Sequence, residues 1–375
     1  MLTGDQGLTD FIRDKIRRDG AVTFAWFMEQ ALYHPEFGYY SSGRCAIGRH
    51  GDYFTNVSIG PLFGRMLATQ FAEMWEVLGR PDDFVIVEQG AHHGDFARDV
   101  LEAVRGKAPE FFAALRYRII EPFPILQQRQ TETLCDFGEK VTWEKSLADL
   151  EPFCGVHFSN ELIDAMPVHL LRRKQGKWEE NLVTISGNGF DFVSAPIADE
   201  TLRRHAEKLP QSLPDDYQIE VNLAASDWIK QVSEKLARGY LLAVDYGYAR
   251  EKMYAPERSD GSLQCYAQHR LVHSPLCEIG HADITARVDW TSVAERGEQH
   301  GLSVAGFADQ HHFFTGLIGE LMPEEFGPQA SPATRRALQT LLHPEFLGTT
   351  FQFLGLSRNA PGDKLSGFRF AQALL

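Results

Sequence analysis

Residues 85–95 read Val-Ile-Val-Glu-Gln-Gly-Ala-His-His-Gly-Asp. The apolar residues 85–87 predict a buried strand, and Gly90 and Gly94 predict a turn into the apolar stretch at 96–104. A strand, a glycine-containing loop and a helix in this order form the loop that holds a nucleoside cofactor in the motifs Gly-x-Gly-x-x-Gly and Gly-x-Gly-x-Gly. The middle glycine is His92 here. The stretch can therefore be a working cofactor loop, an altered one or only a turn with two glycines.

Segments with strand and helix patterns alternate along most of the chain. Helical periodicity runs over residues 8–33, and a long apolar helix is expected over 61–78. Apolar runs then predict strands at 84–88, 117–121, 156–160, 240–245, 303–307 and 350–356, with helices at 97–105, 124–134 and 290–300. Strands that alternate with helices indicate an α/β fold, with a mostly parallel sheet and helices on both of its faces.

Residues 166–220 interrupt this alternation. Apolar and polar residues alternate on both sides of Ser-Gly-Asn-Gly at 186–189, which predicts a β-hairpin. We interpret the region at about 166–230 as an insertion with hairpin and helical parts. It would interrupt one domain that spans 61–375, and residues 1–60 would form an N-terminal helical segment with a loop for substrate or cofactor.

Acidic residues follow several of the predicted strands. Ligands of an open α/β sheet bind beyond the carboxyl ends of its strands, and Glu88, Glu121, Glu161 and Asp245 fall at those ends. A carboxylate after the second strand is the usual partner of two ribose hydroxyls, which predicts this role for Glu121. Each acid taken singly could equally be a solvated loop residue or a charge at a helix start. Their common position favours a binding site.

Composition and motifs argue against several other classes of function. The chain of 375 residues has a net charge of −14, which repels phosphate backbones and makes nucleic acid an unexpected partner. No apolar run approaches the ~18 residues that span a bilayer, so membrane insertion is not expected. The motifs of serine hydrolases, P-loop enzymes and zinc proteases are absent from the sequence. The adjacent pairs His92–His93 and His311–His312 are expected on loops or helix surfaces, with diverging side chains.

The five cysteines are scattered and contain no Cys-x-x-Cys pair, which suits reduced thiols. Cys265 with His269 and Cys277 with His281 repeat a Cys-x3-His spacing that could supply four zinc ligands. Glycine and proline punctuate this stretch, and nothing fixes both pairs on one helical face. We therefore expect no metal.

Eight stretches of the sequence together resemble one family. They read FAWFMEQALYHPEFGYY at 24–40, GDYFT at 51–55, PLFG at 61–64, SNELIDAMPV at 159–168, DYGY at 245–248, GSLQCYAQH at 261–269, DITARVDW at 283–290 and HPEFLGTTF at 343–351. In this order they resemble the MidA-type methyltransferases, which occur in bacteria and, in mitochondria, as assembly factors of respiratory complex I. The resemblance covers nearly the whole chain.

The resemblance implies a class I fold for S-adenosylmethionine (SAM), Rossmann-like, with a seven-stranded sheet and one antiparallel strand near its end. It also implies methylation of arginine in a protein substrate, and it implies that the stretch around Cys265 is not a metal site. The family's loop typically reads VELGPGRG, whereas this chain has VEQGAHHG and so departs from it at His92. A side chain is tolerated there if φ stays negative and Cβ points away from the cofactor. We expect this loop to bind SAM, with the imidazole turned outward or along the edge of the pocket.

The resemblance also suggests the site residues. Contacts with SAM are expected from Glu88, Gly90, His92, Gly94, Glu121, Ser159, Asn160, Gly51 and Thr55, and catalytic roles from Glu161, Asp164 and Asp245. The target guanidinium is always protonated and needs carboxylates that bind it bidentately. Glu161 and Asp164 are three residues apart and fall near one face of a helical turn, which favours this pair. Asp164 could equally be a charge at a helix start.

Three classes of function therefore remain. The leading hypothesis is a SAM-dependent methyltransferase, the second a methyltransferase-like scaffold that has lost the cofactor and binds a partner protein, and the third a dehydrogenase of the NAD type. The loop spacing and the resemblance disfavour the third. Expected partners are a protein substrate, such as a subunit of complex I, and a second copy of the chain in a homodimer. The N-terminus lacks signal-peptide features, so a cytoplasmic bacterial protein is expected.

Overall fold

Contacts within the chain divide the protein into two units. The structure, a computed structural model, describes residues 4–43, 56–267, 270–322, 326, 330–362 and 365–374. Unit 1 consists of Met1–Phe54, Ile163–Asp227 and Tyr248–Asp289, and unit 2 of Thr55–Leu162, Trp228–Gly247 and Trp290–Leu375. The sequence-based organisation, with a boundary at 60 and an insertion at about 166–230, remains a proposal. None of the helices within the described residues has the length and apolarity that a membrane span requires.

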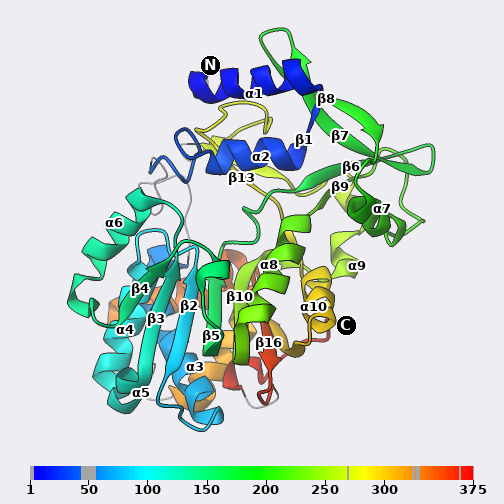
Figure 1. Cartoon of the computed structure of the whole chain (residues 1–375). Helices are drawn as coiled ribbons and strands as arrows, with labels where there is room; N and C mark the ends of the chain where they lie inside the picture. The colour runs from blue at the N-terminus through cyan, green and yellow to red at the C-terminus, as the bar shows by residue number, and fades with distance from the viewer. Residues whose placement is uncertain are drawn as a thin grey trace. The chain divides into compact units, whose positions relative to one another are not determined.

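Seven strands of unit 2 form one mixed sheet (Figure 1). Their order is β15 (Ser303–Asp309), β16 (Phe351–Arg358), β10 (Leu236–Tyr248), β5 (Phe153–Asn160), β2 (Phe84–Gln89), β3 (Leu115–Ile120) and β4 (Val141–Glu144). The pairs from β10 to β4 are parallel, whereas β16 is antiparallel to both of its neighbours. The predicted seven-stranded α/β sheet with one antiparallel strand near its end is confirmed. The strand β4 was not among the segments that the apolar pattern predicted.

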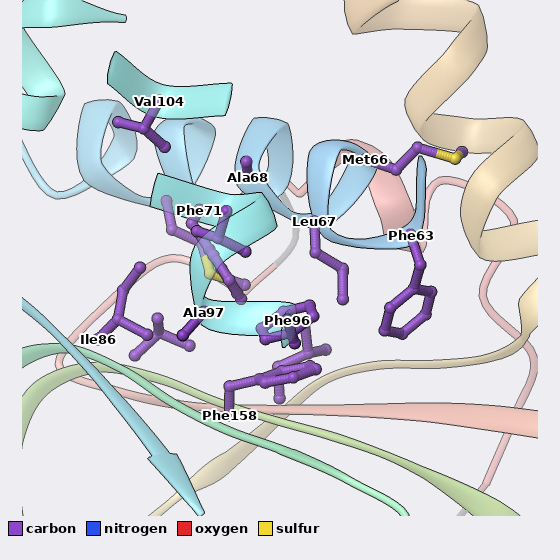
Figure 2. Close-up of a cluster of buried hydrophobic side chains, with 14 of the residues drawn as sticks. Phe63, Met66, Leu67, Ala68, Phe71, Ile86, Phe96, Ala97, Val104 and Phe158 are labelled. Carbon is purple, nitrogen blue, oxygen red and sulfur yellow. The ribbon is translucent and has the colours of Figure 1, made fainter. Parts of the chain in front are cut away.

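Two long helices cover one face of this sheet. In Figure 2, Phe63, Leu67 and Phe71 of α3 (Leu62–Val77) lie beside Phe96 of α4 (Asp95–Lys107) and Phe158 of β5. The rings of Phe96 and Phe158 stack with their centroids 4.4 Å apart. Gly64 allows the two helices to approach closely, because a Cβ there would lie 2.7 Å from Cβ of Asp99. This packing fixes α4, and with it the end of the quoted loop, against the sheet.

The opposite face of the sheet carries other helices. Along β5, His157 points away from Val156 and Phe158 because side chains alternate along a strand. Its ring meets Trp228 of α8 (Leu223–Lys235) edge to face, with the centroids 5.5 Å apart. The remaining helices of unit 2 are α5 (Pro109–Ala114), α6 (Pro124–Thr133), α10 (Trp290–Gln299), α11 (Gln310–Leu321) and α12 (Pro332–Leu342).

Unit 1 contains an antiparallel sheet that joins distant parts of the chain. Its order is β1 (Val22–Thr23), β7 (Lys177–Ser186), β6 (His169–Lys174) and β9 (Gln218–Val221), and β8 (Gly189–Pro196) also pairs with β7. The predicted hairpin is confirmed, since Ser186 pairs with Gly189 across a two-residue turn. The N-terminal helices α1 (Gln6–Asp19) and α2 (Phe24–Tyr33) pack against this sheet. Unit 1 also contains the helices α7 (Glu200–Glu207) and α9 (Arg250–Met253) and the strands β11 (Gln264–Ala267), β12 (Arg270–Leu271), β13 (Asp283–Thr285) and β14 (Val288–Asp289).

Candidate functional site

The loop between β2 and α4 keeps a glycine-type backbone although its middle residue is histidine. Gly90, His92 and Gly94 have φ values of 84°, 48° and 83°. The Gly94 N–H donates to the Ala91 carbonyl over 2.8 Å and closes a four-residue turn with His92 in its second position. A positive φ at that position is normally taken by glycine. The condition stated above for a tolerated side chain, a negative φ, is therefore not met, because the turn imposes the conformation in spite of the side chain.

The two neighbouring histidines of the loop face each other. The rings of His92 and His93 stack with centroids 3.7 Å apart and an interplanar angle of 26°, so the expectation that these side chains diverge is wrong. Nη1 of Arg129, in α6, lies 3.1 Å from Nε2 of His93. Because arginine only donates, His93 accepts here and is neutral. Burial and the nearby charge of Arg129 lower the pKa of His93, which agrees with this role.

Glu121 follows β3 directly, and its carboxylate lies beside the loop. Oε1 accepts from the Phe123 N–H over 3.0 Å, and Oε2 accepts from Nε2 of Gln130 over 2.8 Å. The same amide group of Gln130 donates to the His92 carbonyl over 2.9 Å. Burial raises the pKa of Glu121 to about 7, while the hydrogen bonds from Phe123 and Gln130 favour its charged form. Two predicted site residues, Glu121 and His92, are thus brought together by one buried side chain.

Sequence reasoning missed Gln130 and its partner Trp143. Nε1 of Trp143, in β4, donates to Oε1 of Gln130 over 2.9 Å, and Gln130 itself is fully buried. Gln130 follows the buried Leu126 by four residues on the inner face of α6. That helical spacing was the available signal, because a glutamine on an apolar helix face must satisfy its amide inside the protein.

Glu88 and Gln89 leave the end of β2 on opposite faces of the sheet. The Glu88 carboxylate accepts from the Tyr117 hydroxyl over 2.7 Å, and burial raises its pKa to about 7. Oε1 of Gln89 accepts from Nε1 of Trp228 over 3.0 Å on the other face. Both side chains therefore hold the strand from which the loop begins. A direct contact between Glu88 and a cofactor stays a prediction.

Three more predicted residues lie together at the carboxyl end of β5. Ser159 is buried at the end of the strand, and Asn160 donates from Nδ2 to Oε1 of Glu161 over 3.0 Å. The Tyr246 hydroxyl donates to the other oxygen of Glu161 over 3.4 Å. Glu161 has a φ of 53°, and its N–H bonds to the Val244 carbonyl of β10. The carboxylate of Glu161 is thus half-buried and oriented by two neighbouring side chains.

Asp245 and Asp164 lie in different surroundings. The Asp245 carboxylate is fully buried and accepts from the N–H groups of Leu162, over 3.2 Å, and Tyr246, over 2.8 Å. These bonds join the chain after β5 to the end of β10. Asp164 belongs to unit 1, where its carbonyl accepts from the Ala286 N–H. Because Glu161 belongs to unit 2, a guanidinium site made by Glu161 and Asp164 stays a prediction, as does a catalytic role for Asp245.

Two predicted cofactor residues, Gly51 and Thr55, lie outside the described residues, and so does His269 of the Cys-x3-His pairs. Within the described part of the chain, no group of three histidine, cysteine, aspartate or glutamate side chains is arranged to hold a metal ion. What the described geometry offers is a glycine-type turn before a helix and a buried carboxylate after the second parallel strand. These two features fit the ribose and amino-acid ends of a nucleoside cofactor such as SAM.

Comparisons with known proteins agree with this geometry. The model of a family of S-adenosyl-L-methionine-dependent methyltransferases matches residues 66–308. The mitochondrial protein arginine methyltransferase NDUFAF7 homolog of Drosophila melanogaster is 28% identical over 94% of this chain and 85% of its own length. Human mitochondrial protein arginine methyltransferase NDUFAF7 is 26% identical over 95% of this chain and 84% of its own. A crystal structure from Burkholderia thailandensis, bound to S-adenosyl-homocysteine, is 28% identical, covers 98% of this chain and 96% of its own, and superposes with a TM-score of 0.87.

Proposed function

Because the chain belongs to the MidA-type family of SAM-dependent methyltransferases, we propose that it methylates an arginine side chain of a protein substrate. The observation that carries the proposal is the similarity to protein arginine methyltransferases over nearly the full length of this chain and of theirs. The geometry at the carboxyl ends of two strands supports the proposal. Glu161, after β5, has an oriented carboxylate, and Glu121, after β3, has a buried one.

The residues of unit 2 divide into two roles under this proposal. Glu121 would accept from the ribose hydroxyls, and the turn at 91–94 would bring the start of α4 to the amino-acid end of the cofactor. When bound, SAM supplies a methyl group on a sulfonium centre. Positioning then contributes much of the rate of an in-line displacement.

Glu161 would bind the substrate guanidinium. A guanidinium stays protonated, so an oriented carboxylate both holds it and favours positive charge away from the attacking nitrogen. Asn160 and Tyr246 each donate to one Glu161 oxygen, which orients the carboxylate that would meet the guanidinium. Asp164 would be the second carboxylate, as the sequence predicts.

Two variants separate the roles. Glu161→Gln should abolish transfer of a tritiated methyl group to a lysate of a strain that lacks this gene, and SAM affinity should stay nearly unchanged. Glu121→Ala should weaken SAM binding by ~1–3 kcal/mol, the worth of a charge-assisted hydrogen bond. Glu132→Ala, at an exposed acid of α6, is the matched control and should bind SAM normally. Loss of SAM binding in Glu161→Gln would place Glu161 in the cofactor site instead.

The second candidate is a scaffold that has lost SAM and acts by binding a partner. The positive φ of His92 favours this candidate, since an imidazole stands where the family has glycine. Calorimetry with SAM, its demethylated product and NAD distinguishes the candidates. Binding of SAM or its product supports the enzyme, whereas no binding by the wild type together with binding by His92→Gly would favour the scaffold.

The proposal extends to the cellular setting. A complex I subunit as substrate, a homodimer and a cytoplasmic location in a bacterium are parts of it that come from the sequence. The mitochondrial relatives are protein arginine methyltransferases, which supports a protein as the substrate. Mass spectrometry of arginine-containing peptides from wild-type and deletion strains would identify the substrate.

A further inference from the structure

We propose that Gln130 and Trp143 are positioning residues of the SAM site, which fix the ribose-binding carboxylate and the cofactor loop in one arrangement. This inference rests on the proposed role of Glu121. It names two residues that lie outside the loop and outside the strand ends where the other site residues were found.

The hydrogen bonds of the Gln130 amide leave little freedom. Its NH2 group has two hydrogens and meets two acceptors, Oε2 of Glu121 at 2.8 Å and the His92 carbonyl at 2.9 Å. Its oxygen accepts from the indole of Trp143 at 2.9 Å. Because indole only donates, Trp143 determines which end of the amide faces the site. A rotated amide would place its oxygen against a carboxylate and a carbonyl, where no hydrogen bond can form.

The arrangement explains how the turn is supported with histidine in its glycine position. The bond to the His92 carbonyl holds that peptide at the second position of the turn, where an L-residue has a strained backbone. Oε2 of Glu121 and the peptide after His92 are thereby held by one rigid amide. Since Gln130 is fully buried, breaking either bond would leave an unsatisfied polar group inside the protein.

The same contact has an electrostatic effect that a purely structural residue would lack. Hydrogen bonds from Phe123 and Gln130 favour the charged form of Glu121 against the effect of burial, which raises the pKa of this carboxyl to about 7. Ribose hydroxyls are bound best by the charged carboxylate. We therefore expect SAM affinity to increase as the pH rises through 7, and we expect the midpoint to depend on residue 130.

The test compares Gln130→Met with the control Gln128→Met on the same helix, where Gln128 is exposed and bonds to Glu132. SAM affinity is measured by calorimetry from pH 6 to 8.5, and folding by thermal melting. Gln130→Met should bind SAM about tenfold more weakly at pH 8 and shift the midpoint to higher pH. Gln128→Met should match the wild type. Trp143→Phe keeps both N–H donors of Gln130 and removes only the indole that orients its amide. This variant should weaken SAM affinity and raise the midpoint pH as Gln130→Met does, but by smaller amounts.

The outcomes are distinct. Wild-type affinity and midpoint in Gln130→Met, together with weakened binding in Glu121→Ala, would overturn the positioning role and leave the proposed function intact. Undiminished SAM binding in Glu121→Ala would overturn the ribose-binding role of Glu121 and with it the positioning role. No SAM binding by the wild type would overturn the proposed function as well. If Gln130→Met does not fold, Trp143→Phe decides, and an unchanged midpoint in that variant contradicts the proposal.

Discussion

His92 shows how a turn can impose a backbone conformation on a residue that does not favour it. Its φ of 48° places an L-side chain where glycine has no steric cost. The Gly94 to Ala91 hydrogen bond and the Gln130 bond to the His92 carbonyl both act on the backbone, so they are indifferent to the side chain. The cost is thus local to residue 92.

His92→Gly should therefore stabilise the folded protein, by up to about 1 kcal/mol, because relief of strain exceeds the added entropy of the unfolded chain. Urea unfolding measures this difference. The neighbouring His93 is the matched control: it lacks a positive φ and accepts from Arg129, so His93→Gly should destabilise. Equal effects of the two substitutions would show that the turn stores no strain.

His157 makes stability depend on pH on the acid side. Burial lowers the pKa of His157 to about 3, from 6.5. Between these values only the unfolded chain binds the proton, so stability falls as the pH drops from 6.5 towards 3. Glu88 and Glu121 act in the opposite sense: their pKa values are raised to about 7, so their contribution is complete below 4.5 and is lost as the pH rises through 7.

His157→Phe should remove the acid-side loss. The free energy of unfolding of His157→Phe minus that of the wild type should be larger at pH 4.5 than at pH 7 by about 2–3 kcal/mol. This corresponds to the uptake of one proton by the unfolded wild type over about two pH units. Urea titrations at the two pH values measure the difference. Parallel stability curves for both proteins would mean that His157 titrates equally in the folded and unfolded states.

The positions of Glu88, Glu121 and Glu161 were predictable from sequence, because an acid at or just after the end of an apolar strand lies at the carboxyl edge of the sheet. Their roles in binding stay predictions. Gln130 and Trp143 were missed, because the partner of Gln130 lies in β4, the strand that the apolar pattern did not predict. The sign of φ at His92 could not be read from the sequence, because residue type alone favours a negative value and only the assembled turn reverses it.

At the scale of elements, the C-termini of two helices meet one arginine. Arg358, at the end of β16, donates from Nη1 to the carbonyls of Ser233, in the last turn of α8, and of Leu236, the first residue of β10. It also donates from Nη2 to the His300 carbonyl over 2.8 Å, just after α10. A cation here satisfies carbonyls that have no partner within a helix and complements the negative end of each helix dipole.

Arg358→Met should destabilise unit 2 by about 2–3 kcal/mol, since it removes charged hydrogen bonds and leaves carbonyls without a donor. Thermal and urea unfolding measure this loss. Arg204→Met is the control, because Arg204 is exposed and pairs with Glu200 only at the surface, where the expected change is below ~0.5 kcal/mol. If both variants lost similar amounts of stability, the effect of Arg358→Met would come from the lost positive charge alone and not from the bonds to the helix carbonyls.

Most elements followed from sequence because their patterns are long. The hairpin of β7 and β8 was predicted from Ser-Gly-Asn-Gly, where Gly187 takes a φ of 53° in the turn. The strand β4, Val-Thr-Trp-Glu, was missed because four residues contain too little alternation to separate a strand from a loop. Its place in the sheet comes from pairing with β3.

At the scale of the molecule, unit 1 is built from segments far apart in sequence. Val22 of β1 pairs with Val183 of β7, and both lie in an apolar core with Phe24 and Phe27 of α2. The predicted N-terminal segment and the predicted insertion therefore share one core. No local pattern in either segment indicates this, because pairing between distant strands is set by tertiary packing.

Val183→Asp should place a charge in this core and destabilise unit 1 by at least ~3 kcal/mol. Hydrogen exchange should accelerate in α1 and α2 as well as in the hairpin. Val193→Asp on β8 is the matched control, because Val193 is 42% exposed and its substitution should leave exchange nearly unchanged. Protection that persists in α1 and α2 while the hairpin exchanges would mean that the two segments unfold independently.

The position of β16 has a consequence for synthesis of the chain on the ribosome. β10 and β15 are translated before β16, yet β16 separates them and bonds to both. A nascent chain that has emerged only as far as β15 therefore presents the bare edge of β10, with β15 free to occupy it in a non-native pairing. Vectorial folding of this protein should pause at that stage, and the open edge is the place where a chaperone would bind before β16 arrives.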